Sequence, residues 1–60
     1  MSLLTAKDVA ARLNVSERTA LRLLARGEIH GFKVSGKIWR VAEGHLLEYI
    51  ARELERTKAA

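Results

Sequence analysis

Apolar residues recur at helical spacing in two short segments near the beginning of the chain. Val9 and Leu13 lie about one helical turn apart, and the pattern around them predicts a helix over residues 6–13. Ala20 and Leu24 repeat this spacing further on, which predicts a second helix of about nine residues with a narrow inward face. The two segments therefore predict a pair of short helices joined by a tight turn.

Residues with known capping preferences bound these two helices. Thr5 is a suitable N-cap for the first helix and is followed three positions later by an acidic residue, a pattern similar to a capping box. Asn14 tolerates the unusual backbone angles of a turn, and we expect Val15 to fill the core between the helices. Ser16 is the expected N-cap of the second helix, and Gly27 is the expected left-handed residue that ends it.

Residues 29–41 change to the alternating pattern of β-strands on either side of Ser35 and Gly36, which predicts a β-hairpin. If Val34 pairs with Lys37, the hairpin has one apolar face and one face that carries charge. The apolar face then consists of Phe32, Val34, Trp39 and Val41, and the opposite face carries Lys33, Ile38 and Arg40.

The last segment predicts a third helix over residues 42–57 with two apolar stripes. Leu46 and Tyr49 belong to the stripe that we expect to pack on the first two helices. The second stripe consists of Leu47, Ala51 and Leu54. It has two interpretations, because it could pack under the N-terminal arm or, with leucines seven residues apart, form a seam for a partner helix.

Length and charge narrow the possible functions. The chain of 60 residues predicts a single domain, residues 1–60, whose core must be aliphatic because no cysteine is available for a disulfide. The formal charge is +4, and seven basic residues against two acidic ones lie between Arg12 and Arg40. Positive charge concentrated in the middle of the chain is expected for a surface that faces a polyanion.

Several classes of site and location are not expected. His30 and His45 lack metal-ligand spacing, so we expect no metal site and no cofactor. No paired carboxylates, activated nucleophile or glycine-rich phosphate loop is present, so we expect no enzymatic activity. No apolar run approaches the ~20 residues of a membrane span, and the beginning of the chain lacks a basic signal region. We therefore expect a cytoplasmic protein, associated with the nucleoid of a bacterium or a phage.

The combined pattern resembles the excisionase-like helix-turn-helix domains, relatives of the MerR-type winged helix. The matching positions are Leu4, Thr5, Val9, Ala10, Leu13, Val15, Ser16, Thr19, Gly27, Glu28, Ile29, Trp39, Arg40, Val41, Leu46 and Tyr49. Both the elements and the resemblance, which covers residues 3–50, predict a mainly α fold with a small β-hairpin in the order α-α-β-β-α. The helix-turn-helix would cover residues 5–27 and the wing residues 29–41. The chain departs from the family by having Ala42 where many relatives have proline, a Ser-Gly wing tip and a longer last helix.

The resemblance implies that the second helix enters the major groove of DNA. The candidate contact residues on this helix are Ser16, Glu17, Arg18, Thr19, Arg22 and Arg26. Arginine can bridge both acceptors of guanine, which favours Arg18 for base readout and Arg22 for contact with a base or a phosphate. Alternatives stay open for the others, since Ser16 could serve only as a cap, Glu17 could interact only with the helix dipole, and Arg26 could be an ordinary surface charge.

The resemblance also implies that the wing contacts the DNA backbone or the minor groove. The candidate wing residues are Lys33, Ser35, Gly36, Lys37 and Arg40. Trp39 could in principle stack on a base, but its place in the hairpin favours a role in the core.

The function predicted from these residues is sequence-specific binding of double-stranded DNA. Within the family this implies either an excisionase-like architectural factor that directs recombination or a small transcriptional regulator. The expected partners are duplex DNA, neighbouring copies of the protein, and a recombinase or the transcription machinery. The alternative is a protein–protein adaptor that uses the helical face and the stripe containing Leu47 and Leu54.

Overall fold

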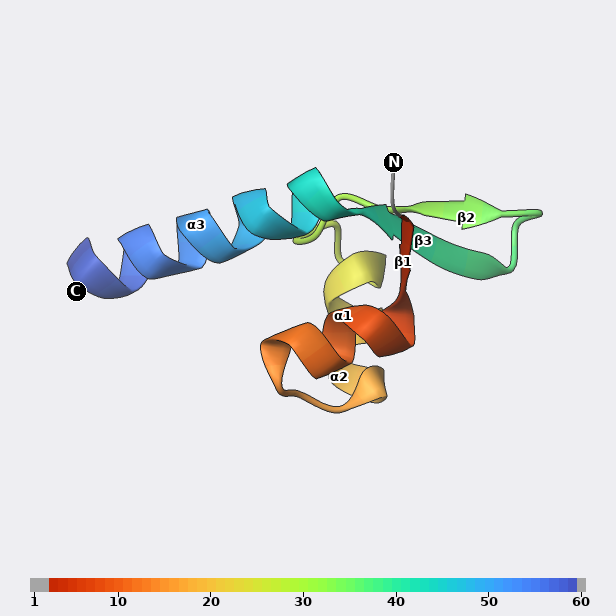
Figure 1. Cartoon of the computed structure of the whole chain (residues 1–60), viewed down its shortest axis with the longest axis horizontal. Coiled ribbons are helices and arrows are strands. Elements are labelled where there is room, and N and C mark those ends of the chain that lie inside the picture. The colour runs from red at the N-terminus through yellow and green to blue at the C-terminus, as the bar shows by residue number, and fades with distance from the viewer. Residues whose placement is uncertain (1–2, 60) are drawn as a thin grey trace.

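Three helices and a three-stranded antiparallel sheet make up the computed structural model, which describes residues 3–59 (Figure 1). The elements in chain order are β1 (Leu3–Thr5), α1 (Ala6–Leu13), α2 (Glu17–Ala25), β2 (Phe32–Val34), β3 (Ile38–Ala42) and α3 (Glu43–Ala59). This arrangement confirms the predicted fold class, a mainly helical fold with a small β-hairpin. The prediction missed β1, because a strand of three residues is too short to show a period of two.

Strand β1 joins the beginning of the chain to the hairpin. The sheet order is β1-β3-β2, so β3 is the central strand and lies between the other two. Leu4 of β1 lies opposite Val41 of β3, and Thr5 lies opposite Arg40. Because Leu4 and Val41 are both buried, their pairing fixes which face of the sheet turns toward the helices.

The predicted caps of α1 are confirmed. The backbone N–H of Thr5 donates to the Asp8 carboxylate, and the N–H of Asp8 donates to the Thr5 hydroxyl, each over 3.0 Å. This reciprocal pair forms a capping box with aspartate in the usual place of glutamate. At the other end, Asn14 has a φ of 58°, and the N–H of Val15 donates to Ala10 O over 3.0 Å. The chain therefore leaves α1 through a left-handed asparagine.

Helix α2 is bounded as the sequence predicted. The Ser16 hydroxyl accepts a hydrogen bond of 3.2 Å from the N–H of Thr19, as an N-cap does. Gly27 follows the last turn with a φ of 77°. Its N–H donates to Leu24 O over 3.1 Å, and the N–H of Glu28 donates to Leu23 O over 3.0 Å. These two bonds form a Schellman motif, which satisfies carbonyl groups that the helix end would leave free.

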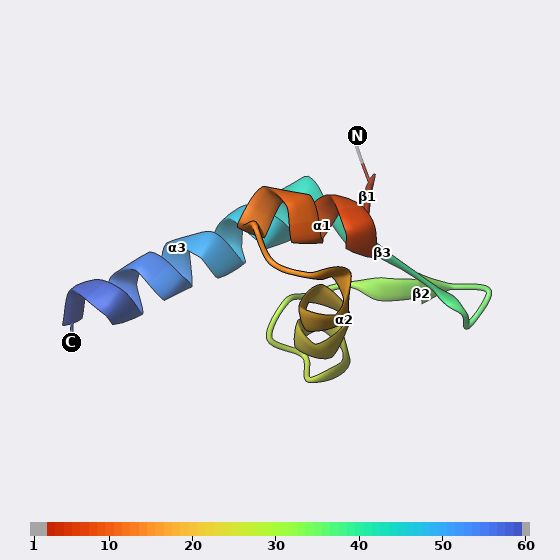
Figure 2. The same ribbon diagram turned by 90° about the horizontal axis from the view of Figure 1, so that it is seen from below.

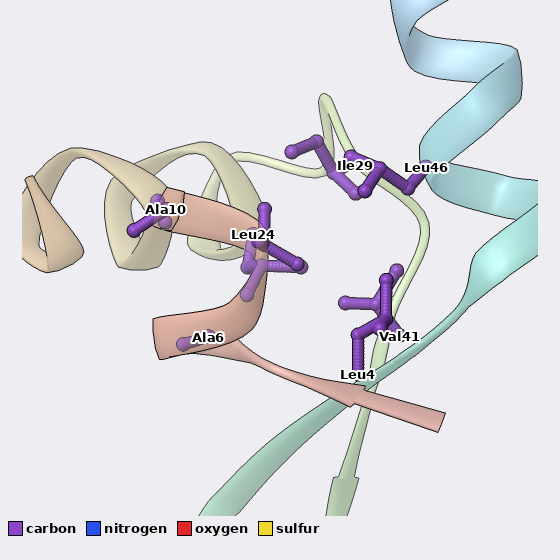
Figure 3. Close-up of a cluster of buried hydrophobic side chains, with 9 residues drawn as sticks. Leu4, Ala6, Ala10, Leu24, Ile29, Val41 and Leu46 are labelled. Atoms are coloured by element: carbon purple, nitrogen blue, oxygen red, sulfur yellow. The ribbon is translucent and has the colours of Figure 1, made fainter. Parts of the chain in front are cut away.

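The core draws on both short helices, the sheet and the beginning of α3. The buried hydrophobic residues are Leu4, Ala6, Val9, Ala10, Ala20, Leu24, Ile29, Val41 and Leu46. Figure 3 shows Ile29, from the loop before the hairpin, pointing toward Leu46 of α3. The prediction that Val15 fills the core is wrong, because its side chain is 39% exposed. The turn after α1 carries Val15 outward, and Ile29 contributes a fully buried side chain without belonging to a strand.

The hairpin register differs by one residue from the prediction. Val34 pairs with Ile38, and Trp39 lies opposite Lys33 rather than Phe32. The reason lies in the turn, where Ser35 and Gly36 have φ angles of 56° and 69° and the N–H of Lys37 donates to Val34 O. Lys37 is then an extra residue before pairing resumes, as in a β-bulge.

This register changes the composition of both hairpin faces. Lys33 joins Trp39 and Val41 on the face that carries the core, whereas Phe32, Val34 and Ile38 share the other face. Phe32 is accordingly 48% exposed, so its predicted place in the core is wrong. Trp39 remains half-buried against the core, as expected.

Helix α3 begins at Glu43 and continues to Ala59, two residues beyond the predicted end at residue 57. Its inward stripe is confirmed, since Leu46 is buried and Tyr49 packs against the core cluster. The Arg52 guanidinium donates a hydrogen bond of 2.7 Å to Glu28 O, which ties the helix to the loop after α2. In both views, the hairpin tip and the C-terminal end of α3 point toward opposite ends of the molecule (Figure 1, Figure 2).

Candidate nucleic-acid interface

The outward face of α2 carries two arginines one helical turn apart. Ala20 and Leu24 bury the opposite face of the helix, with exposed fractions of 0% and 2%. Arg18 and Arg22 each lie two positions before these residues, which places them on the solvent side. Neither guanidinium forms an ion pair within residues 3–59. Both are therefore available to an external acceptor.

Glu17 and Arg26 lie at the two ends of α2 and differ in their surroundings. Glu17 is exposed in the first turn, where its carboxylate also faces the positive end of the helix dipole. Arg26 forms the C-cap of α2, and its Nε lies 3.3 Å from the Glu28 carboxylate. An exposed ion pair of this kind holds the side chain only weakly. Arg26 is therefore only slightly less available than Arg18 and Arg22, which form no ion pair within residues 3–59.

The hydroxyl groups at the start of α2 bond to each other. The oxygen atoms of Ser16 and Thr19 are 3.0 Å apart, in addition to the capping bond from the Thr19 backbone. This arrangement fixes the first turn of α2. A contact of either hydroxyl group with phosphate stays a prediction.

Lys33 and Arg40 of the wing lie on opposite faces of the hairpin, whereas the predicted register placed both on one face. The Lys33 ammonium lies 5.3 Å from the centre of the Trp39 ring, at the distance of a cation–π contact. Arg40 points to the other face and donates a hydrogen bond of 2.9 Å from Nη1 to Trp39 O. Lys37 follows Ser35 and Gly36 at the exposed tip. The wing thus presents cations on both faces and at its end.

A hollow of about 400 Å³ lies between the beginning of α1, α2 and the β2–β3 hairpin. Its lining comes from the beginning of α1, the outward side of α2 and the hairpin: Thr5, Ala6, Lys7, Glu17, Leu21, Lys37, Ile38, Trp39 and Arg40. Three cations and one carboxylate are among these residues. One concave surface is therefore bordered by Glu17 from the predicted α2 contacts and by Lys37 and Arg40 from the predicted wing contacts.

Lys7 is the charged residue of this lining that the sequence analysis did not predict. The sequence places Lys7 beside Asp8, so the two formal charges cancel. In the structure, however, the Asp8 carboxylate is occupied by the Thr5 backbone, and this bond lowers the pKa of Asp8. The capping box could have given this signal, because a capping carboxylate turns back toward the helix start, away from its neighbour in sequence.

A family model described as "Helix-turn-helix domain" matches residues 3–54, most of the chain. The chain belongs to the helix-turn-helix domain family. A helix-turn-helix domain implies binding to DNA rather than catalysis. Neither the curated proteins nor the solved structures compared with the chain include a significant match.

Outside this surface, the described part of the chain meets the requirements of neither a metal site nor a membrane span. The fold brings His30 and His45 together, with ring centres 5.6 Å apart, although they are distant in sequence. Among residues 3–59, no group of three or more potential ligands surrounds a common point where a metal ion could bind. No helix in the same part of the chain combines the length and hydrophobicity needed to cross a membrane.

Proposed function

We propose that this helix-turn-helix domain binds duplex DNA sequence-specifically, with α2 in the major groove and the β2–β3 hairpin against the neighbouring backbone or minor groove. The observation that carries the proposal is the pair of exposed guanidiniums on α2 that form no ion pair within residues 3–59. Arg18 and Arg22 project from the face opposite the buried Ala20 and Leu24. Each guanidinium can donate two hydrogen bonds to one guanine, so each can contribute to base readout.

The other candidate residues are suited to different parts of the DNA. Glu17 can accept a hydrogen bond from cytosine N4, whereas Ser16 and Thr19 are suited to phosphate oxygens. On the wing, Lys33, Lys37 and Arg40 are suited to the backbone or to a narrow minor groove. Arg26 is an additional candidate once its ion pair with Glu28 opens. The backbone at Ser35 and Gly36 would lie closest to the duplex at the wing tip.

Two biological roles fit this mode of binding. Resemblance to excisionase-like sequences supports an architectural factor that directs a recombinase, and the same surface would also serve a small transcriptional regulator. In both roles the domain acts by occupying a defined site and by contacting a recombinase or the transcription machinery. A cytoplasmic, nucleoid-associated location in a bacterium or phage follows from either role.

A protein–protein contact is the second candidate function, and the exposed stripe on α3 favours it. Leu47 and Leu54 are 55% and 65% exposed, and Ala51 between them is exposed as well. The interpretation that this stripe packs under the N-terminal arm finds no support within residues 3–59, because both leucines stay open to solvent. A partner helix or a neighbouring copy on DNA would cover the stripe and raise the effective concentration at the site.

Selection from a random duplex library, followed by a salt series, tests the proposal. We expect enrichment of a defined site and an affinity that falls steeply as salt rises, because each phosphate contact releases counterions. An adaptor that binds through leucines would show no enriched sequence and a nearly flat salt dependence. Sedimentation of the free protein at several concentrations would separately detect pairing through α3. A variant carrying Leu47→Ser and Leu54→Ser provides the matched control for that measurement.

A further inference from the structure

We propose that the hollow between α2 and the wing holds one backbone phosphate of the duplex, and that Lys7 of α1 is one of its ligands. This inference rests on the proposed function and adds a contact residue outside both α2 and the hairpin. The ligand class is a phosphodiester of the DNA strand that separates the two grooves.

The three cations of the hollow come from three different elements of the fold. Lys7 comes from α1, Lys37 from the hairpin turn and Arg40 from β3, yet all three line the same hollow. One carboxylate, that of Glu17, lies on the α2 side of the lining. It would repel a phosphate toward the three cations and remain free to face a base edge.

Arg40 is held in place by a hydrogen bond, whereas Lys7 and Lys37 are free to move toward a bound phosphate. Arg40 is anchored through its Nη1 bond to Trp39 O and is half-buried, so its remaining N–H groups need little reordering to meet an anion. Lys7 and Lys37 are exposed and take no part in an ion pair within the described residues. Their ammonium groups can therefore close on a phosphate without breaking an existing contact.

Part of the lining of the hollow is apolar. Ala6, Leu21, Ile38 and Trp39 contribute walls without charge beside the three cations. Apolar walls of low dielectric strengthen the field of nearby charges in a concave site. A phosphate entering the hollow would thus meet a stronger field than one lying on an open lysine-rich surface.

The path of a bound DNA strand would also lead through the hollow. With α2 in the major groove and the hairpin at the next groove, the intervening sugar-phosphate strand must pass between the two elements. The hollow is bordered by Glu17 and Leu21 of α2 on one side and by Lys37 and Arg40 of the hairpin on the other. It therefore lies where that strand has to cross.

Duplexes that carry a single neutral methylphosphonate linkage provide the test, with the full chain and its selected site. In the wild-type protein we expect one or two linkages to reduce affinity by about tenfold when neutralised, as loss of a charge-assisted contact would. In Lys7→Ala the affinity for the normal duplex should fall, and the extra loss at one of these linkages should shrink to about twofold or less. The slope of log K against log salt should also fall by about 0.9.

Two further variants keep the result interpretable. Lys7→Arg retains the charge and should retain the wild-type methylphosphonate profile. Lys58→Ala removes the same charge from the far end of α3 and should also leave the profile unchanged. Thermal melting checks that each variant is folded, which the exposure of both lysines leads us to expect.

Three outcomes would overturn the inference. If Lys7→Ala keeps the wild-type profile and salt slope while the protein still selects a DNA site, the phosphate ligand is wrong and the proposed function stands. If Lys7→Ala changes sequence preference without affecting any single linkage, Lys7 acts on bases rather than on a phosphate. If the wild-type protein selects no site and its binding is independent of salt, the proposed function and this inference fail together.

Discussion

Lys33 and Trp39 face each other across the hairpin, with the ammonium 5.3 Å from the centre of the indole ring. This pairing places a cation on the sheet face that carries the core. It also removes Phe32 from the position opposite Trp39. The contact thus reports directly on the register of β2 against β3.

Replacing Lys33 tests that register. We expect Lys33→Met to lower the free energy of unfolding by about 0.5–1 kcal/mol, because a cation–π contact at an exposed site is worth about that much. Lys33→Arg keeps a cation over the ring and should change stability less. Urea denaturation followed by tryptophan fluorescence gives both values. Nuclear Overhauser contacts between the rings of Phe32 and Trp39, without contacts between Lys33 and Trp39, would support the register predicted from the sequence instead.

Arg18→Ala and Arg22→Ala test the recognition helix. Each should reduce discrimination between the selected site and random duplex by about 1–3 kcal/mol, the worth of a bidentate arginine–guanine contact. The double variant should bind all duplexes alike. Melting temperatures should stay close to the wild-type value, because both side chains are exposed. Full discrimination in the double variant, measured by competition against random duplex, would refute the assignment of α2 to the major groove.

The capping box of α1 predicts a dependence of stability on pH. Hydrogen bonds from Thr5 lower the pKa of Asp8 in the folded protein, so the folded state binds this proton less readily than the unfolded chain does. The stabilisation is therefore present above the unfolded pKa of about 3.9 and is lost as pH falls through the lower, folded pKa. Asp8→Asn should lack this part of the acid dependence.

Thermal melting between about pH 2 and pH 6 measures the effect, since this window covers the titration of aspartate. Glu55→Gln, at an exposed position near the end of α3, is the matched control and should follow the wild-type profile. A wild-type curve that is parallel to that of Asp8→Asn across the whole range would show that the carboxylate does not stabilise α1.

Substitution by alanine is expected to have opposite effects on stability at Gly31 and at Gly44. A methyl group at Gly31 would lie 2.8 Å from Leu24 Cδ2 and 3.1 Å from Arg40 O. We expect Gly31→Ala to destabilise the fold by about 1–3 kcal/mol, because the packed core would have to shift. Gly44, in the first turns of α3, has open space around it, so Gly44→Ala should be neutral or stabilising by up to about 1 kcal/mol. Calorimetry of both variants checks the pair, and equal melting temperatures would contradict the close approach at Gly31.

The helices could be predicted because their ends depend on neighbouring residues in the sequence. Features that depend on contacts between distant residues were not predicted. Thr5, Ser16 and Gly27 act on their own helix ends, so each could be assigned from its immediate neighbours. The register of the hairpin depends on the bulge at Lys37, which no residue type specifies. The burial of Ile29 depends on a partner in α3, and Val15 turned outward because the geometry of the turn outweighed its hydrophobicity.

The candidate site was likewise predictable only where it depends on local sequence. The exposure of Arg18 and Arg22 follows from helical periodicity, and both could be chosen from the sequence. The hollow could not be predicted, because Lys7 and Lys37 line the same surface only after β1 pairs with β3. A strand of three residues without a turn signal gives no indication of that pairing.

Thr5 belongs to β1 and also caps α1, while β3 ends at Ala42 and α3 begins at the next residue. No spacer separates the sheet from the helix on either side, so the wing has little freedom to swing relative to the helix-turn-helix. A duplex that contacts the wing and the helix-turn-helix at the same time must therefore adapt its own shape, by bending or by changing its groove width. Sites with easily deformed base steps would then be preferred even at positions that no side chain touches.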